Sequence, residues 1–246
     1  ILVCGTTGEG STMTLEEKKE VIKFSVEVVN KRVPVIAGTG TNNTKASIEL
    51  SKYAEEVGAD MVLIITPYYN KTSQKGLYAH FSAINDAINI PIMLYNVPSR
   101  TGMNITPLML DKLADLNNVV AIKEASGDLS QVAKMAELCG DRIAIYSGND
   151  DQIVPILSLG GAGVVSVLAN ILPEETHNIC EKYFLGEVIE SRNLQLKYLS
   201  LANSLFIETN PIPVKTANKI IYYIISIIAF RWLCLFKTNI GGTNYG

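Results

Sequence analysis

The stretch Val119-Val120-Ala121-Ile122-Lys123 places a lysine directly after a short run of apolar residues. A run that is apolar on both faces is typical of a buried strand in a parallel sheet, so we predict that the amine lies at the end of such a strand. Burial disfavours the ammonium form and lowers the pKa of a lysine, which leaves part of the amine neutral and nucleophilic near neutral pH. The pattern therefore allows imine chemistry at Lys123, although a strand-end lysine that reaches into solvent is the commoner case.

Short apolar runs alternate with amphipathic stretches along the chain. The runs cover residues 1–4, 33–37, 61–65, 90–95, 119–122, 143–146 and 163–167, and the stretches with apolar residues at helical spacing cover 14–30, 44–57, 74–88, 106–116 and 129–139. This alternation predicts parallel strands in βα units. Seven units at intervals of roughly thirty residues favour a barrel over an open doubly wound sheet, although the period alone allows both.

The predicted fold class is α/β, a TIM (β/α)8 barrel that lacks its first βα unit and is followed by C-terminal helices. An eight-stranded barrel needs one strand more than these runs supply. We divide the chain into a barrel over residues 1–170, containing strands 2–8, and a C-terminal helical region over 171–246, with helices predicted over 174–184 and 191–206. Residues 219–246 are atypical, because 220–236 is an apolar stretch somewhat too short to span a membrane. We expect a terminal helix there, or a tail foreign to the fold.

Composition excludes several classes of protein. The chain is 48% hydrophobic and carries a net charge of −3, so it has no basic surplus for a nucleic acid. Its four cysteines include no Cys-x-x-Cys pair, and its two histidines are not spaced as metal ligands, so we predict neither a disulfide framework nor a metal site. The absence of a leader pattern makes a cytoplasmic location the expectation.

Polar motifs follow six of the apolar runs, and each comes before a predicted helix. They are Gly5-Thr6-Thr7-Gly8-Glu9, Gly38-Thr39-Gly40, Thr66-Pro67-Tyr68-Tyr69-Asn70, Asn96-Val97-Pro98-Ser99-Arg100-Thr101-Gly102, Lys123-Glu124-Ala125-Ser126-Gly127 and Ser147-Gly148-Asn149-Asp150. In a barrel these positions converge on the C-terminal face, where active sites of this architecture are built. This convergence favours imine chemistry at Lys123 over a solvent-exposed lysine.

Other residues at this face suit the same chemistry. Tyr95 ends the strand before that of Lys123, so its phenol could shuttle protons, although a tyrosine at the solvent edge is equally common. Thr6 and Thr7 lie in a glycine-bounded turn that could hold a carboxylate, a weakly specific pattern. Arg100 could bind a second carboxylate or be an ordinary surface charge. The glycines at 160–163 precede a strand instead of following one, which favours a tight turn over a nucleotide site.

These motifs, together with Asn210-Pro211-Ile212-Pro213-Val214-Lys215, resemble the dihydrodipicolinate synthase family within the class I pyruvate-dependent aldolases, and the resemblance extends from residue 1 to about residue 216. It implies a lyase of lysine and diaminopimelate biosynthesis in which Lys123 forms a Schiff base with pyruvate. The enamine then attacks the aldehyde of L-aspartate 4-semialdehyde, and the adduct cyclises with loss of water.

The resemblance also implies roles for other residues. Tyr95, Thr6 and Tyr69 match the proton-relay triad of the family, in which the position of Tyr69 is contributed across a dimer interface. Substrate-binding positions comprise Thr7 and the carbonyl of Val165 for pyruvate, Arg100 for the semialdehyde carboxylate, and Gly148 lining the pocket. Members are usually homotetramers built as dimers of dimers, and no metal or organic cofactor is implied.

Two alternatives stay open. N-acetylneuraminate lyase and the 2-keto-3-deoxy-sugar-acid aldolases share the turn, the tyrosine and the lysine. The doubled threonine and the loop around Arg100 favour the synthase, because a dicarboxylate product needs a cation for its second carboxylate. A non-catalytic metabolite-binding barrel is the other alternative, since fold alone does not fix function. Retention of Lys123, Tyr95 and Thr6 together argues against it.

Overall fold

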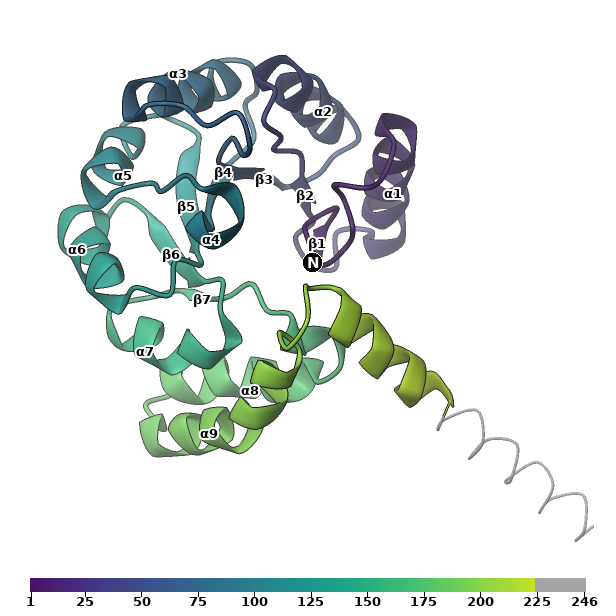
Figure 1. Ribbon diagram of the computed structural model, residues 1–246, viewed down its shortest axis with the longest axis vertical. Helices are drawn as coiled ribbons and strands as arrows, with labels where there is room; N and C mark the ends of the chain where they lie inside the picture. The colour runs from purple at the N-terminus through teal and green to yellow at the C-terminus, as the bar shows by residue number, and fades with distance from the viewer. Residues whose placement is uncertain (224–246) are drawn as a thin grey trace, which may run out of the picture.

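The computed structural model describes residues 1–223 (Figure 1). Its seven strands are parallel and lie side by side in chain order. They are β1 (Leu2–Val3), β2 (Ile36–Gly38), β3 (Met61–Ile65), β4 (Ile92–Asn96), β5 (Val119–Glu124), β6 (Ala144–Ser147) and β7 (Gly163–Val164). The prediction of seven parallel strands in βα units is confirmed, although β1 and β7 are shorter than the apolar runs that mark them.

Helices cover the outer face of the sheet, which curls into an open ring with the helices outside it (Figure 1). The helices are α1 (Leu15–Val29), α2 (Thr44–Glu56), α3 (Gln74–Asn85), α4 (Pro98–Thr101), α5 (Pro107–Leu113), α6 (Leu129–Cys139), α7 (Ile153–Ser158), α8 (Pro173–Phe184) and α9 (Val188–Ser204), with short 3₁₀ turns η1 (Asp150–Gln152) and η2 (Leu168–Asn170). Polar N-caps start five of them. In each, an oxygen of Thr14, Asn43, Ser73, Thr106 or Asp128 accepts a backbone N–H of the first turn.

The two faces of each strand pack into different cores. In β4, Ile92 and Leu94 belong to the cluster shared with the helices, whereas Met93 and Tyr95 belong to a smaller cluster inside the curl. In β5, Ile122 faces the helices and Ala121 faces the inside. Because side chains alternate along a strand, Lys123 points to the inside of the curl and Glu124 to the helices.

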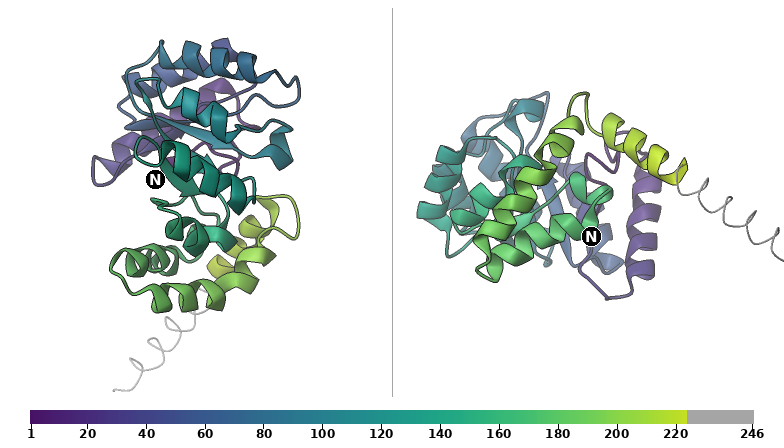
Figure 2. Two further views of the ribbon diagram at one scale, coloured as in Figure 1. Left: turned by 90° about the vertical axis from the view of Figure 1, so that its left-hand side faces the viewer. Right: turned by 90° about the horizontal axis from the view of Figure 1, so that it is seen from below.

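Helices α8 and α9 pack against each other and against α7, η1 and η2, at the end of the sheet that carries β7 (Figures 1 and 2). Gln195 on α9 accepts the N–H of Val154 at 2.8 Å and donates to the carbonyl of Asp150 at 2.9 Å, which holds the helix hairpin to the loop after β6. Residues 212–223 are helical as well. Of the apolar stretch predicted at 220–236, only the first four residues are described, and 224–246 lie outside the described residues. Within residues 1–223, none of the helices is both long enough and apolar enough to cross a membrane.

Candidate active site

Lys123 and Tyr95 meet across neighbouring strands. The register of β4 and β5 sets Tyr95 opposite Lys123, and the Lys123 Nζ lies 4.4 Å from the centroid of the Tyr95 ring. The sequence pattern predicts that the two side chains face each other, and the structure brings them together inside the curl.

The Lys123 amine has an unusually low proton affinity. Burial lowers its pKa from the ordinary 10.5 to about 8; the charge of Asp150 opposes this shift, and that of Arg100 adds to it. A pKa near 8 leaves roughly a tenth of the amine neutral at pH 7, several hundred times the fraction of an ordinary lysine. The pKa of Tyr95 is raised by burial, and the Arg100 charge and the Thr6 hydroxyl oppose that shift. The pair thus combines a nucleophilic amine with a phenol that keeps its proton at neutral pH.

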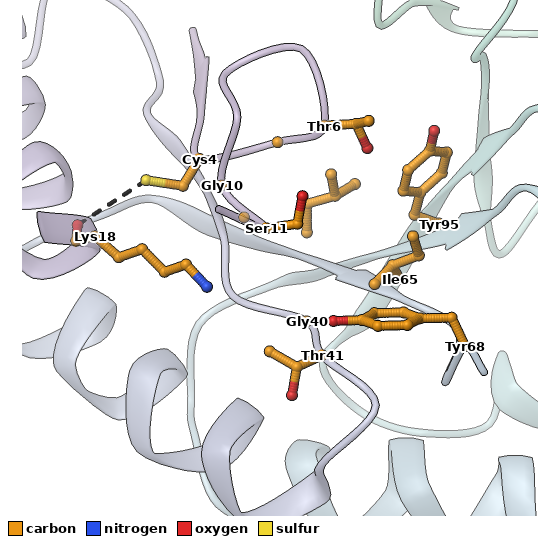
Figure 3. A pocket seen from close by; sticks show the side chains of 13 residues that line it. Cys4, Thr6, Gly10, Ser11, Lys18, Gly40, Thr41, Ile65, Tyr68 and Tyr95 are labelled. Atoms are coloured by element: carbon orange, nitrogen blue, oxygen red, sulfur yellow. Dashed lines mark hydrogen bonds between the residues drawn. The ribbon is translucent and has the colours of Figure 1, made fainter. Parts of the chain in front are cut away.

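Two threonines from the turn after β1 reach the same region. Thr6 lies beside Tyr95 at a small cavity of about 80 Å³ (Figure 3). Thr6 and Thr7 also line a larger cavity of about 780 Å³, together with Lys123 and Val165. Hydroxyls and an amine thus line the same cavity, a combination that suits a small keto acid.

Gly148 and Val165 shape the wall next to the lysine. A Cβ placed on Gly148 would lie 2.6 Å from the Ala125 Cβ and 3.2 Å from the Lys123 Cε, so a side chain there would push the lysine out of place. The Val165 N–H donates to the Ser147 carbonyl at 2.8 Å, which fixes the backbone that carries the Val165 carbonyl.

Arg100 and Tyr69 are placed differently from this cluster. Arg100 lies on α4 with its side chain exposed, yet its charge lowers the pKa of both Tyr95 and Lys123, so it acts at the mouth of the site. Tyr69 is 92% exposed, on a loop where its own φ is +67°. A side chain so exposed makes little contact with its own subunit, and the structure does not bring Tyr69 to Lys123.

Sequence reasoning gave no role to two residues that the structure places at the site. Asp150 is 5% exposed, and its Oδ2 accepts the N–H groups of Val167 and Leu168 at 3.0 and 2.9 Å. Its carboxylate is the main charge that raises the pKa of Lys123. Asn210 donates to the Thr7 hydroxyl at 2.9 Å. The sequence indicated them only by position, since Asp150 ends the motif that starts at Ser147 and Asn210 begins the motif that ends at Lys215.

Near Asn210, an ion pair also links the segment that follows α9 to the turn after β1. Lys215 forms an ion pair with Glu9 at 2.9 Å, next to the turn that carries Thr6 and Thr7. The segment around Asn210 thereby anchors that turn through one partly buried hydrogen bond and one exposed ion pair, of which the exposed ion pair contributes the less.

A lysine of lowered pKa, a phenol over it and a cavity with convergent hydroxyls define an imine-forming enzyme of the class I aldolase type, a lyase. The family model described as the dihydrodipicolinate synthetase family matches residues 1–226. The 4-hydroxy-tetrahydrodipicolinate synthase of Clostridium perfringens (strain 13 / Type A) is 97% identical over 223 residues, which are 91% of this chain and 77% of that protein. That of Clostridium novyi (strain NT) is 68% identical over 88% of this chain and 73% of its own length.

Solved structures agree with these matches. The crystal structure of dihydrodipicolinate synthase from Aquifex aeolicus superposes with a TM-score of 0.87 at 43% identity, covering 88% of this chain and 74% of that one. The chain belongs to the dihydrodipicolinate synthetase family, as its motifs predict.

Proposed function

We propose that this chain is a 4-hydroxy-tetrahydrodipicolinate synthase that condenses pyruvate with L-aspartate 4-semialdehyde through an imine on Lys123. The single observation that carries the proposal is the Lys123 Nζ at 4.4 Å from the Tyr95 ring, with the pKa of the amine lowered to about 8. A solved relative from Acinetobacter baumannii, 43% identical, is complexed with pyruvate, a small keto acid that the larger cavity beside this lysine can hold.

In the proposed reaction, the neutral Lys123 amine attacks the keto carbon of pyruvate to give a carbinolamine. Loss of water gives the imine, and loss of a methyl proton gives the enamine. The enamine carbon forms the new bond to the semialdehyde aldehyde. Tyr95 exchanges protons with these intermediates. The Thr6 side chain, in the turn after β1, is a hydrogen-bond partner of the Tyr95 phenol. The neighbouring Thr7 hydroxyl and the Val165 carbonyl hold the pyruvate end.

Tyr69 and Arg100 complete the proposed site from its edge. Arg100 binds the carboxylate of the semialdehyde by a two-pronged contact, and Tyr69 completes the proton relay from a second subunit. Its 92% exposure supports this, since the side chain is free to enter a neighbouring subunit. A homo-oligomer is therefore part of the proposal, and so is a cytoplasmic location, which rests on the family alone.

Replacement of Arg100 tests the proposal. Arg100→Ala should lower turnover of the semialdehyde by about a hundredfold, because a charged partner is lost. Pyruvate imine formation should persist, slowed at neutral pH only because loss of the Arg100 charge raises the pKa of Lys123. Arg192→Ala, which removes an exposed arginine on α9, is the matched control and should leave both unchanged. Equal turnover by Arg100→Ala and the control would contradict this assignment. Turnover of N-acetylneuraminate or of a 2-keto-3-deoxy sugar acid would favour N-acetylneuraminate lyase or the sugar-acid aldolases. Pyruvate binding without turnover would favour a non-catalytic metabolite-binding barrel.

We further propose that β1–β7 correspond to strands 2–8 of a (β/α)8 barrel, with strand 1 belonging between β7 and β1. In the described residues, β1 and β7 each pair with a single neighbour, and the cavity of about 780 Å³ lies between them. Leu2, Ile36 and Met93 line it, apolar surface that a further strand would bury. The division into a barrel over 1–170 and a helical region over 171–246 belongs to the same proposal.

A further inference from the structure

Behind the reactive pair, the opposite face of the same two strands holds a buried polar pair. Asn96 follows Tyr95 and Glu124 follows Lys123, and the register sets Asn96 opposite Glu124. Since side chains alternate along a strand, this second pair faces the helices. Asn96 is 0% exposed and Glu124 is 1% exposed. Such burial is costly for a carboxylate and an amide unless every polar atom is bound.

Asn96 is fully bound and has only one possible orientation. Its Nδ2 donates to Glu124 Oε2 and to Asn104 Oδ1, both at 2.8 Å, and its Oδ1 accepts the backbone N–H of Ile105 at 2.9 Å. The Ile105 N–H can only donate, so the carbonyl of Asn96 must face it. The amide group is thereby directed at Glu124 across the strand boundary.

Glu124 accepts hydrogen bonds on its other oxygen as well. Oε1 accepts the N–H of Ser126 at 2.7 Å and, more loosely, the Gln131 amide at 3.5 Å. Gln131 exchanges two hydrogen bonds with Asn104 at 2.7 and 3.2 Å, and Gln74 donates to the Asn104 carbonyl at 2.9 Å. Burial raises the pKa of Glu124, and these donors oppose the shift. Within residues 1–223 no cation forms an ion pair with Glu124, so neutral donors alone hold it.

We propose that Asn96 and Glu124 are positioning residues, which fix the distance between the Lys123 amine and the Tyr95 phenol from the face of the sheet that substrate never touches. The inference rests on the proposed function. The register of the two strands ends at these residues, where the Ala125 N–H still donates to the Asn96 carbonyl at 2.9 Å. The Asn96–Glu124 hydrogen bond adds a side-chain link to this backbone contact, one residue beyond the reactive pair. A misplacement of about 1 Å at a reacting group can cost a hundredfold in rate.

Exchange of the two groups tests the link. Glu124→Gln keeps the shape of the side chain but replaces one acceptor oxygen by an –NH₂ donor. That –NH₂ group then faces another donor, because Glu124 accepts each of its hydrogen bonds from Asn96, Ser126 and Gln131. In Asn96→Asp, two carboxylates face each other. The double variant with Asn96→Asp and Glu124→Gln reverses donor and acceptor and restores the cross-strand hydrogen bond. The Asn104 and Gln131 side-chain amides must turn over with it, because Asn104 Oδ1 now accepts from Asn96 and would otherwise face the new carboxylate. Such a cycle separates the coupling from the cost of each change alone.

The control breaks a partly buried hydrogen bond at the other end of β5. The Asn85 side chain, also buried, accepts the N–H of Asn118, which directly precedes the strand. Asn85→Ala therefore destabilises the same strand without touching the end that carries Lys123. Melting temperatures of all variants show how much stability each has lost.

The measurement is the rate of pyruvyl adduct formation on the full chain, trapped with borohydride and followed by peptide mass spectrometry over a range of pyruvate concentrations. We expect each single variant to lower the limiting rate by about 10- to 100-fold with the half-saturating pyruvate concentration nearly unchanged. The double variant should recover most of the rate, and Asn85→Ala should keep it even at an equal loss of melting temperature.

Two results would overturn the inference in different ways. Rates that follow melting temperature across all variants, Asn85→Ala included, or single variants as fast as the unsubstituted chain, would show that the pair has no positioning role. Absence of any adduct in the folded, unsubstituted chain would instead overturn the proposed function, and the inference with it.

Discussion

Replacement of Lys123 by Met should make the protein more stable at neutral pH while it abolishes imine formation. The folded state lowers the pKa of Lys123 from 10.5 to about 8, and each factor of ten in proton affinity corresponds to about 1.4 kcal/mol. Holding the ammonium in the folded protein at pH 7 therefore costs about 3 kcal/mol, an upper bound because Lys123 also lines the open cavity. Methionine has a similar length and no charge, so we expect a gain of about 1–3 kcal/mol.

The stability gained by Lys123→Met should depend on pH in a defined direction. The folded pKa of Lys123 lies below the unfolded one, so the penalty is complete below about pH 8 and disappears as pH rises through 10.5. The gain from Lys123→Met should accordingly shrink between pH 7 and pH 10 in urea unfolding. Lys197→Met is the control, because Lys197 lies 4.9 Å from the centroid of the Tyr198 ring but is exposed. A loss of stability in Lys123→Met, or a gain independent of pH, would show that the folded protein does not disfavour the Lys123 ammonium.

Three further predictions concern the site and its scaffold. Asp150→Asn removes the carboxylate that raises the pKa of Lys123, so the midpoint of the pH–rate profile for imine formation should fall below 8. An unchanged midpoint would show that the Asp150 charge does not act on Lys123. Gly148→Ala should slow imine formation by about 10- to 100-fold, because its Cβ would meet Ala125 and Lys123, and a normal rate in a stopped-flow assay would contradict the packing. A βα unit placed before residue 1 to supply the proposed strand 1 should raise the melting temperature by at least about 5 °C by pairing with β7 and β1; an equal or lower value would count against the proposed strand position.

The order and type of the strands were predictable because they depend on local pattern. Apolar runs bounded by polar turns mark all seven strands, and the position of Lys123 after one run places it at the C-terminal edge. The pairing of Tyr95 with Lys123 follows from neighbouring strands of one parallel sheet. The pattern of apolar residues does not predict where β5 ends. The apolar run stops at Ile122, whereas the strand continues to Glu124 and so buries a carboxylate.

The remaining features depend on contacts between distant parts of the chain. Asp150 binds backbone N–H groups 17 and 18 residues further on, and Asn210 binds Thr7 across 203 residues. Neither contact leaves a periodic trace in the sequence. Likewise, the exposure of Tyr69 depends on the shape of its loop, which a run of polar residues does not determine.

Imine formation on Lys123 is tested most directly by borohydride reduction of the folded chain with pyruvate at pH 8, followed by peptide mass spectrometry. We predict a stable pyruvyl adduct on Lys123 in preference to the other lysines, because its amine has the lowered pKa and lies in the cavity. No adduct, or adducts spread evenly over the surface lysines, would contradict it.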